Sequence, residues 1–308
     1  MLWNIRSKKA EIETAEAVNR DRTLTEQAWI QFKYNKRAMF GLAIIGVLLL
    51  IVVATVVIDI ATSNAFYEDQ VIRQNLRMKL KGPSLEHPLG CDEFGRDMLL
   101  RLLWGTRYSL LLGVCAVTIA MFVGGPLGMI AGFYGGKVDN YIMRVMDVFM
   151  ACPFILMAMA IVAALGPSTV NLLIALGVSG MASFSRVTRA AVMAVKDKEF
   201  VESARAVGAN DAVIMVKYIL PNAMAPILVQ LTLRIGTSIL HVAGLSYIGL
   251  GVQPPAPEWG AILTAAKVYM RDAWHISVFP GLFLVITVVA FNLFGDGLRD
   301  ALDPKLKR

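Results

Sequence analysis

The chain has 308 residues, a hydrophobic fraction of 56%, a charged fraction of only 17% and a formal net charge of +7. Soluble domains average about 45–50% apolar and about 25% charged residues, so this composition, with its apolar residues in long blocks, excludes a soluble protein and indicates a multi-pass membrane protein. The basic residues form no dense patch with interleaved aromatic residues, and we therefore expect a lipid bilayer and no nucleic acid as its surroundings.

Residues 1–37 are polar and mixed in charge, and we expect them to form a cytoplasmic tail that ends in an interfacial helix. Thr23-Leu-Thr-Glu26 matches a capping box, and Trp29 and Phe32 lie on one partly apolar helical face. The alternative is a solvated helical tail. The first residues contain no apolar stretch of the kind found in signal peptides, so we expect no cleavable signal.

The first two transmembrane helices are expected on either side of a long polar connection. Residues 38–58 contain no charge and are long enough to cross a bilayer. Residues 59–108 are polar and are expected as an external segment. The second span is expected over residues 109–133, where Gly124-Gly-Pro-Leu-Gly128 would either kink the helix or let a neighbouring helix approach closely.

Further apolar stretches predict spans over residues 141–165, 170–195, 221–245 and 276–298, which gives six in all. In the third span we expect Asp147 to form a structural ion pair with nearby Arg144. Arg234 and His241 fall inside the fifth span. Ionisable groups within a membrane are usually functional, so these two residues are candidates for lining a translocation pathway.

The distribution of basic residues predicts the orientation. If the N-terminus lies inside, most of the 30 Lys and Arg residues fall in segments on the inner side. The positive-inside rule then places both termini and residues 196–221 in the cytoplasm, and residues 59–108 and 246–275 outside.

The polar stretch Lys196–Pro221, KDKEFVESARAVGANDAVIMVKYILP, is too charged to cross a membrane. Its pattern predicts a short helix over residues 199–207 that ends at Gly208. Asn210 or Asp211 can then cap a second helix over residues 212–220. A compact helix–Gly–helix on the membrane surface is expected to contact another protein.

The sequence contains no motif for chemistry of its own. The nearest approach to a Walker A motif, Gly136-Lys137, is followed by Val138 and has Ala131 in place of the first glycine. The histidines are scattered, the three cysteines form no CxxC pair, and no GxSxG is present. We therefore expect no enzyme activity, metal or cofactor in this chain, and an energy source in another subunit. An ion-coupled secondary transporter is the alternative from a different class.

Residues 196–221 resemble the EAA loop of permease subunits in bacterial ABC importers. Glu202-Ser203-Ala204 is followed at the family spacing by Gly208 and Leu220-Pro221, with Ser203 and Tyr218 in place of the usual Ala and Ile. The resemblance implies that this loop docks on an ATPase and transmits its movement. The residues expected to act in this coupling are Glu202, Ser203, Ala204, Arg205, Gly208, Ala209, Leu220 and Pro221.

Three further stretches are similar to the C-type permease of oligopeptide, dipeptide and nickel importers. They are His87–Asp97, Gly244–Pro255 with Trp259-Gly260, and Phe291–Pro304. The resemblance implies an all-α, six-span type I importer permease of the bacterial inner membrane, with residues 109–308 as its five-helix core. It also implies a homologous second permease as heterodimer partner, two ATPases that hold ATP and Mg²⁺, and an extracytoplasmic binding protein. Peptides are the expected substrate, and nickel or another small solute is the alternative.

Overall fold

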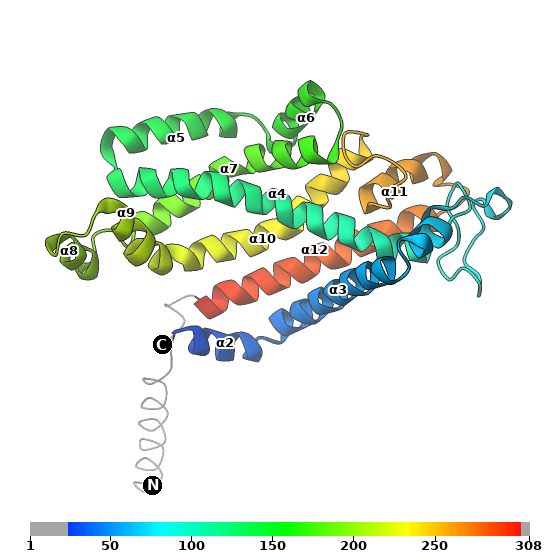
Figure 1. Ribbon diagram of the computed structural model, residues 1–308, viewed down its shortest axis with the longest axis horizontal. Coiled ribbons are helices and arrows are strands. Elements are labelled where there is room, and N and C mark those ends of the chain that lie inside the picture. The colour runs from blue at the N-terminus through cyan, green and yellow to red at the C-terminus, as the bar shows by residue number, and fades with distance from the viewer. Residues whose placement is uncertain (1–23, 303–308) are drawn as a thin grey trace, which may run out of the picture.

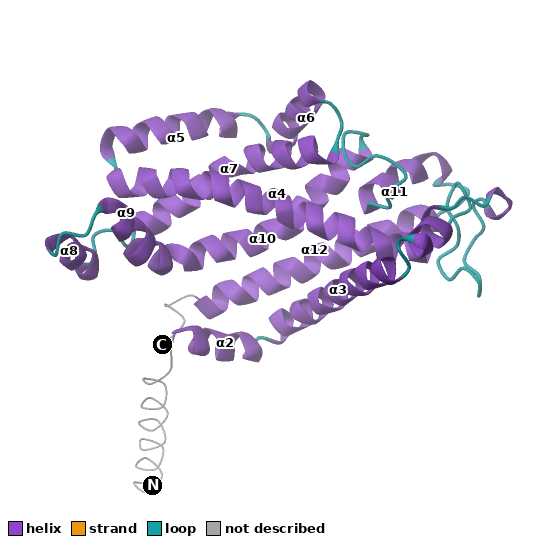
Figure 2. Ribbon diagram, viewed as in Figure 1, coloured by secondary structure: helices purple, strands orange, loops and turns teal. Residues whose placement is uncertain are grey.

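The computed structural model describes residues 24–302, and within that range the fold is a bundle of helices without a strand (Figures 1 and 2). The predicted all-α membrane fold is confirmed. The α-helices are α2 (Leu24–Tyr34), α3 (Lys36–Ala61), α4 (Met98–Tyr134), α5 (Gly136–Ala151), α6 (Phe154–Leu165), α7 (Thr169–Met193), α8 (Glu199–Ala206), α9 (Asp211–Val213), α10 (Leu220–Tyr247), α11 (Trp259–Ala266) and α12 (His275–Leu302).

Five helical segments are long and apolar enough to cross a membrane. They are α3, α4, α7, the helical run Asp211–Tyr247 and α12. The pair α5 and α6 would be a sixth span, but it is bent by 87°. Pro153 precedes α6, and a proline cannot donate the backbone hydrogen bond that would continue the helix. The span expected over residues 141–165 is therefore broken at Pro153.

Helix α4 begins at Met98, well before the expected start of the second span at residue 109. The Asp97 carboxylate caps the helix by accepting a hydrogen bond from the Leu100 amide at 2.8 Å. The charges of Arg101 and Arg107 suggested an external segment, but both residues lie inside α4. Each has a carboxylate partner: Arg101 pairs with Asp92, and Arg107 with Asp59. Paired charges can occupy a helix that unpaired charges would exclude.

The glycine-rich stretch of α4 permits close packing against α7. A Cβ added at Gly124 would lie 2.0 Å from the carbonyl oxygen of Met181, and one at Gly128 would lie 2.1 Å from that of Ser185. Residues four apart lie on one face of a helix, so the glycines form a groove that admits the α7 backbone. The two expected effects of this stretch were a kink in the helix and a close approach of a neighbouring helix. The structure shows the close approach of α7, and α4 continues through Pro126.

The N-terminal part of the described chain packs beside α12. A helix, α2, is present in this part of the chain, and its Phe32 is buried beside Ala38 and Ala301, with its ring 5.5 Å from that of Phe294. Asn35 separates α2 from α3 and caps α3 with its side-chain oxygen. The expectations for residues 1–23, including Thr23 of the capping box, and for residues 303–308 lie outside the described residues.

The two ends of the bundle differ in what they carry (Figure 1). At one end, here called the loop end, lie α8, α9, the start of α3 and the end of α12. At the other, here called the opposite end, lie residues 62–97 and α11 with its flanking loops. Segments that the charge distribution assigns to one side of the membrane thus lie at the same end of the bundle.

Candidate functional site

The loop over residues 196–221 has the expected helix–Gly–helix form. Helix α8 ends at Ala206, and Gly208 follows with φ of +89°, a left-handed conformation that glycine adopts without strain. Of the two candidate caps, the structure uses Asn210, whose side-chain oxygen accepts a hydrogen bond from the Val213 amide at 2.9 Å. Asp211 is the first residue of α9 instead.

The second helix of the loop does not stop before the membrane segment. Helix α9 continues through a π-helical stretch, Ile214–Ile219, directly into α10. Leu220 and Pro221 form the first turn of α10. The expected boundary between the loop helix and the fifth span is therefore absent, and the loop is joined rigidly to α10.

The loop is anchored by an apolar underside. Val201 and Ala204 of α8 are buried in a cluster with Ile214 and Ile219 of the π-helical stretch. The same cluster contains residues at the ends of two transmembrane helices, namely Phe133 of α4 and Val192 and Ala191 of α7. A force on α8 is therefore carried by packed side chains to α4, α7 and α10.

The outer face of the loop carries the polar residues singled out from the sequence. Glu202, Ser203, Arg205 and Gly208 are exposed, whereas Ala204 is buried and Ala209 and Leu220 are half-buried. The Ser203 hydroxyl donates to the Glu199 carbonyl oxygen at 2.8 Å, so it is satisfied within α8. The Arg205 guanidinium lies 5.9 Å from the centre of the Phe133 ring. The predicted residues thus divide into an exposed face and an anchor.

Sequence reasoning missed an apolar part of this exposed face. Val207 is 90% exposed and Val216 is 62% exposed, and Phe200 and Val213 are also exposed. Val207 and Phe200 lie outside the apolar helical run Asp211–Tyr247, and exposed apolar residues in a polar loop are typical of a protein–protein contact. A signal was available in the sequence, because Val207 directly precedes the glycine that ends α8.

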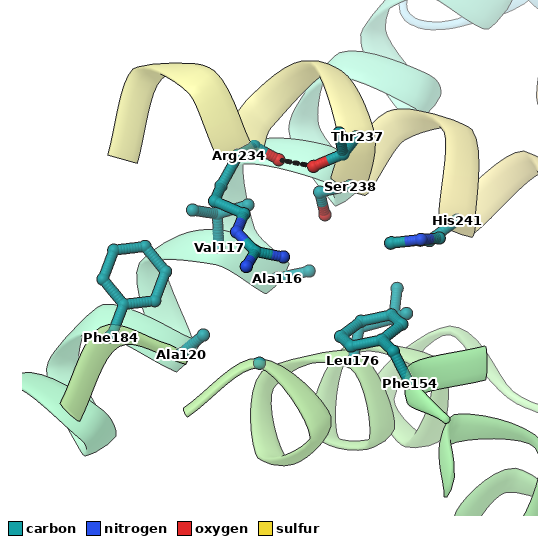
Figure 3. A pocket seen from close by; sticks show the side chains of 11 residues that line it. Ala116, Val117, Ala120, Phe154, Leu176, Phe184, Arg234, Thr237, Ser238 and His241 are labelled. Atoms are coloured by element: carbon teal, nitrogen blue, oxygen red, sulfur yellow. Dashed lines mark hydrogen bonds between the residues drawn. The ribbon is translucent and has the colours of Figure 1, made fainter. Parts of the chain in front are cut away.

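Arg234 and His241 line one cavity of about 20 Å³, which is room for about one water molecule (Figure 3). They lie on the same face of α10, and Figure 3 shows both side chains directed into the space between α10 and the helices below. Helices α4, α6 and α7 supply the remaining wall. The His241 ring stacks on Phe154, the first residue of α6, with ring centres 4.3 Å apart.

One wall of the cavity is formed by part of a polar stripe on α10, which sequence reasoning did not identify. Gln230, Arg234, Ser238 and His241 recur at spacings of three and four, which places them on one helix face. Ser183 of α7 accepts hydrogen bonds from Arg234 at 2.7 Å and from Gln230 at 3.1 Å. The spacing of these polar residues within an apolar segment was the signal that could have revealed the stripe.

The expected partner of Asp147 is wrong. Asp147 of α5 pairs with Arg186 of α7 at 2.6 Å, not with Arg144 of its own helix. A second pair, Asp139 with Arg189, joins the same two helices through two hydrogen bonds of 2.5 Å. These contacts between distant parts of the chain hold α5 along α7, and they replace the local pair that proximity in sequence had suggested.

The opposite end contains a buried group of charges. The Asp92 carboxylate contacts Arg96 at 2.6 Å and Arg101 at 3.2 Å, and all three side chains are at most 5% exposed. Glu93 completes the group through Arg96. Burial, and then the nearby Asp92, raises the pKa of the Glu93 carboxyl. The paired charges fix residues 92–101 as a rigid unit.

Glu258 is fully buried where residues 248–258 meet α11. Its carboxylate caps α11 by accepting hydrogen bonds from the Gly260 and Ala261 amides at 2.9 and 2.8 Å. Ser109 of α4 donates to the same carboxylate. Burial raises the pKa of Glu258, and the two backbone hydrogen bonds oppose that increase. Glu258 thereby ties α11 to α4.

The histidines and cysteines at the opposite end have structural partners. His87 contacts Asp97 at 2.7 Å, and His275 contacts the Cys91 carbonyl oxygen at 3.1 Å. Burial raises the pKa of the Cys91 thiol to about 11, which keeps it protonated at neutral pH. In the part of the chain that the structure describes, no three His, Cys, Asp or Glu residues are grouped so that they could hold a metal ion.

Two family models match the chain. The family described as "Binding-protein-dependent transport system inner membrane component" matches residues 124–308, which include the loop, most of the residues that line the cavity, and α12. The model described as "N-terminal TM domain of oligopeptide transport permease C" matches residues 23–83, which include α2 and α3.

Individual relatives match over most of the chain. The dipeptide transport system permease protein DppC of Alkalihalophilus pseudofirmus is 44% identical over 281 residues, which cover 91% of this chain and 90% of that protein. The glutathione transport system permease protein GsiD of Escherichia coli is 45% identical over 286 residues, 93% of this chain and 92% of that protein. An inward-facing structure of the methionine ABC transporter MetNI shares the fold at 20% identity, with a TM-score of 0.55 over 67% of this chain and 98% of that chain.

Proposed function

This chain belongs to the family of binding-protein-dependent transport system inner membrane components, and from this premise we propose that it forms half of the translocation pathway of an ATP-driven peptide importer. It is a multi-pass transport subunit of the bacterial inner membrane and not an enzyme. Di- and oligopeptides are the proposed substrates because relatives at 44% and 45% identity are named for dipeptide and glutathione transport.

The observation that carries the proposal is the construction of the loop over residues 196–221. Its outer face presents Glu202, Arg205 and the apolar Val207, and its underside is packed against three transmembrane helices. An exposed face on a rigid base is what a mechanical contact with an ATPase requires. The residues that we propose to act in this coupling, either in the contact or in its anchor, are Glu202, Ser203, Ala204, Arg205, Gly208, Ala209, Leu220 and Pro221, and we add Val207 to the contact because it is exposed.

The remaining parts of the machine are proposed as follows. The loop end faces the cytoplasm, which agrees with the bias of basic residues toward the segments gathered there. A homologous second permease completes the pathway as a heterodimer, two ATPases bind ATP and Mg²⁺, and an extracytoplasmic binding protein delivers the peptide to the opposite end. Movement of the ATPases then pushes α8 and rocks α4, α7 and α10 between inward- and outward-open arrangements.

The contact is tested by charge reversal in the complete transporter, reconstituted in liposomes with its ATPases and binding protein. We expect Glu202→Lys to reduce ATP-driven dipeptide uptake at least tenfold while ATP hydrolysis continues, because exposed charges at an interface steer and fix docking. Asp197→Lys is the matched control, an exposed reversal in the same loop but outside α8. Normal coupling in the E202K transporter would remove the proposed role of α8.

The substrate is tested in the same liposomes. Labelled dipeptide, glutathione and Ni²⁺ are offered in turn with the cognate binding protein, and we expect ATP-dependent accumulation of the peptides. Accumulation of Ni²⁺ without peptide uptake would contradict the peptide assignment and leave the ATP-driven importer intact.

A further inference from the structure

The cavity on α10 contains a cation without an anion. Arg107, Arg186 and Arg189 each contact a carboxylate. Among residues 24–302, the only hydrogen bond from the Arg234 guanidinium goes to the Ser183 hydroxyl at 2.7 Å, and Arg234 has no ion pair. A guanidinium has five donor hydrogens, so most of its capacity is directed at no protein acceptor.

The position of Arg234 makes the lack of an anionic partner energetically unfavourable. It lies near the middle of α10, where an arginine that faces lipid is energetically unfavourable. Figure 3 shows the guanidinium directed into the cavity rather than away from the bundle. Intramembrane arginines are retained where they meet water or a transported anion, and a guanidinium holds a carboxylate through two parallel hydrogen bonds.

The rest of the cavity surrounds the guanidinium with a hydroxyl and with apolar side chains. Ser238 lies between Arg234 and His241 on the same face of α10 and supplies a hydroxyl. Phe154 and Phe184 supply aromatic walls from α6 and α7. The cavity has a volume of only about 20 Å³, which is room for about one water molecule, so a carboxylate group can enter it but a whole peptide cannot.

The break between α5 and α6 places one of these walls. Phe154 is the first residue after the 87° bend and stacks on His241. Transporters commonly build substrate sites where a membrane helix is discontinuous, since a broken helix can move as two pieces. The bend thus brings an aromatic ring to a polar stripe that a straight helix would not present in this way.

We propose that the cavity is a transient binding site for the carboxylate of the transported substrate, with Arg234 as the binding residue. This inference rests on the function proposed above. The guanidinium pairs with the carboxylate of the peptide during passage, and Ser238, His241, Phe154 and Phe184 border the site of that carboxylate. An uncharged amide in place of the carboxylate loses the ion pair.

The first test changes the protein and the substrate in a double-mutant cycle. ATP-driven uptake of a dipeptide and of its C-terminal amide is measured in liposomes with the wild-type and the Arg234→Gln transporter. The same binding protein delivers each ligand to both transporters, so its own preference cancels. We expect R234Q to lower kcat/KM for the dipeptide about tenfold and to change it less than twofold for the amide, because only the carboxylate makes the charged pair. Equal losses for both ligands would overturn the assignment.

Two variants separate charge from geometry. Arg234→Lys keeps the charge but loses the planar fork, so we expect an intermediate loss for the dipeptide. Arg144→Gln removes an exposed arginine of α5. We expect this variant to have the same kcat/KM values as the wild type for the dipeptide and for its amide. If R234Q instead releases the second permease during purification, the anion is an acidic residue of that subunit and the proposal is wrong.

The second test needs no delivery by the binding protein. Thr237 lines the cavity, and Thr237→Cys is prepared with Cys115→Ser and Cys152→Ser. Anionic sulfonatoethyl and cationic trimethylammonioethyl methanethiosulfonates of similar size are then compared for their rates of reaction with this cysteine. We expect the anion-to-cation rate ratio to fall severalfold when Arg234→Gln is added, because the positive charge concentrates anions locally.

The two tests distinguish the site from the function. A transporter that takes up no peptide but keeps the charge-dependent ratio at residue 237 would sink the peptide importer and leave an anion site. A transporter that takes up peptide but shows an unchanged ratio in R234Q would sink the anion site and leave the importer.

Discussion

The two ends of this bundle use charged residues in opposite ways. At the opposite end, Asp92, Arg96 and Arg101 are buried and paired with one another, and Glu258 is buried as a helix cap. At the loop end, Glu202 and Arg205 are exposed and have no carboxylate or basic partner among residues 24–302. Charges that are paired internally serve the fold, and charges left at the surface are available to another protein. We therefore expect substitutions at the opposite end to change stability, and substitutions at the loop end to change coupling to the ATPases.

The largest expected effect is at the buried charge group. Asp92→Ala leaves Arg96 and Arg101 buried without their shared carboxylate, so we expect the free energy of unfolding to fall by about 3–5 kcal/mol. Unfolding in mixed micelles, followed by circular dichroism, measures the change. Asp69→Ala is the control, because its contact with Arg73 is exposed and is worth at most about 1 kcal/mol. Similar losses in both proteins would contradict the contrast.

The next effect concerns the helix pair that joins the two ends. Gly128→Ala places a Cβ 2.1 Å from the Ser185 carbonyl oxygen, so α4 and α7 must separate, at a cost of about 1–3 kcal/mol. Gly46→Ala in α3 meets no atom within 4 Å and is expected to be neutral or slightly stabilising. The same unfolding measurement ranks the two proteins. A G128A protein as stable as G46A would show that the close packing is not required.

A smaller, pH-dependent effect is expected at Glu258. Burial raises the pKa of its carboxyl in the folded state, so folding favours the protonated acid. The stability that the raised pKa contributes is fully present below the usual glutamate pKa of about 4.3. It is lost as the pH rises through the raised pKa of the folded state. We therefore expect the wild type to lose stability relative to Glu258→Gln as the pH rises above about 4, by at most about 1.4 kcal/mol per pH unit. Parallel pH curves for the two proteins would count against this.

The smallest effect on stability, and a clear effect on assembly, is expected at Val207. Val207→Ser changes a side chain that is 90% exposed, so the free energy of unfolding should change by no more than about 0.5 kcal/mol. Retention of the ATPases during purification should nevertheless decrease, because the exposed apolar side chain is proposed to contact them. Val268→Ser makes the same change at the opposite end, where the residue is 82% exposed, and should leave retention unchanged. Equal retention in both proteins would break the functional contrast between the ends.

Several features of the fold could be predicted because they depend on local sequence. Long uncharged stretches required membrane helices, and Gly208 marked the end of α8 because a left-handed residue there favours glycine. Asp147 shows the limit of such reasoning. Proximity along α5 suggested Arg144, but the bundle brings Arg186 of α7 closer, and sequence separation carries no information about that distance.

The sequence alone determined that the chain crosses a membrane several times, that a polar helix–Gly–helix loop interrupts these spans, and that Arg234 and His241 lie inside one of them. These follow from hydrophobicity, backbone preference and the cost of burying charge. Only the tertiary structure decided that the third span breaks at Pro153, that α4 begins at Met98, and that the two ionisable residues share a cavity closed by Phe154. Each of these depends on which side chains from distant segments meet, and packing sets that in three dimensions.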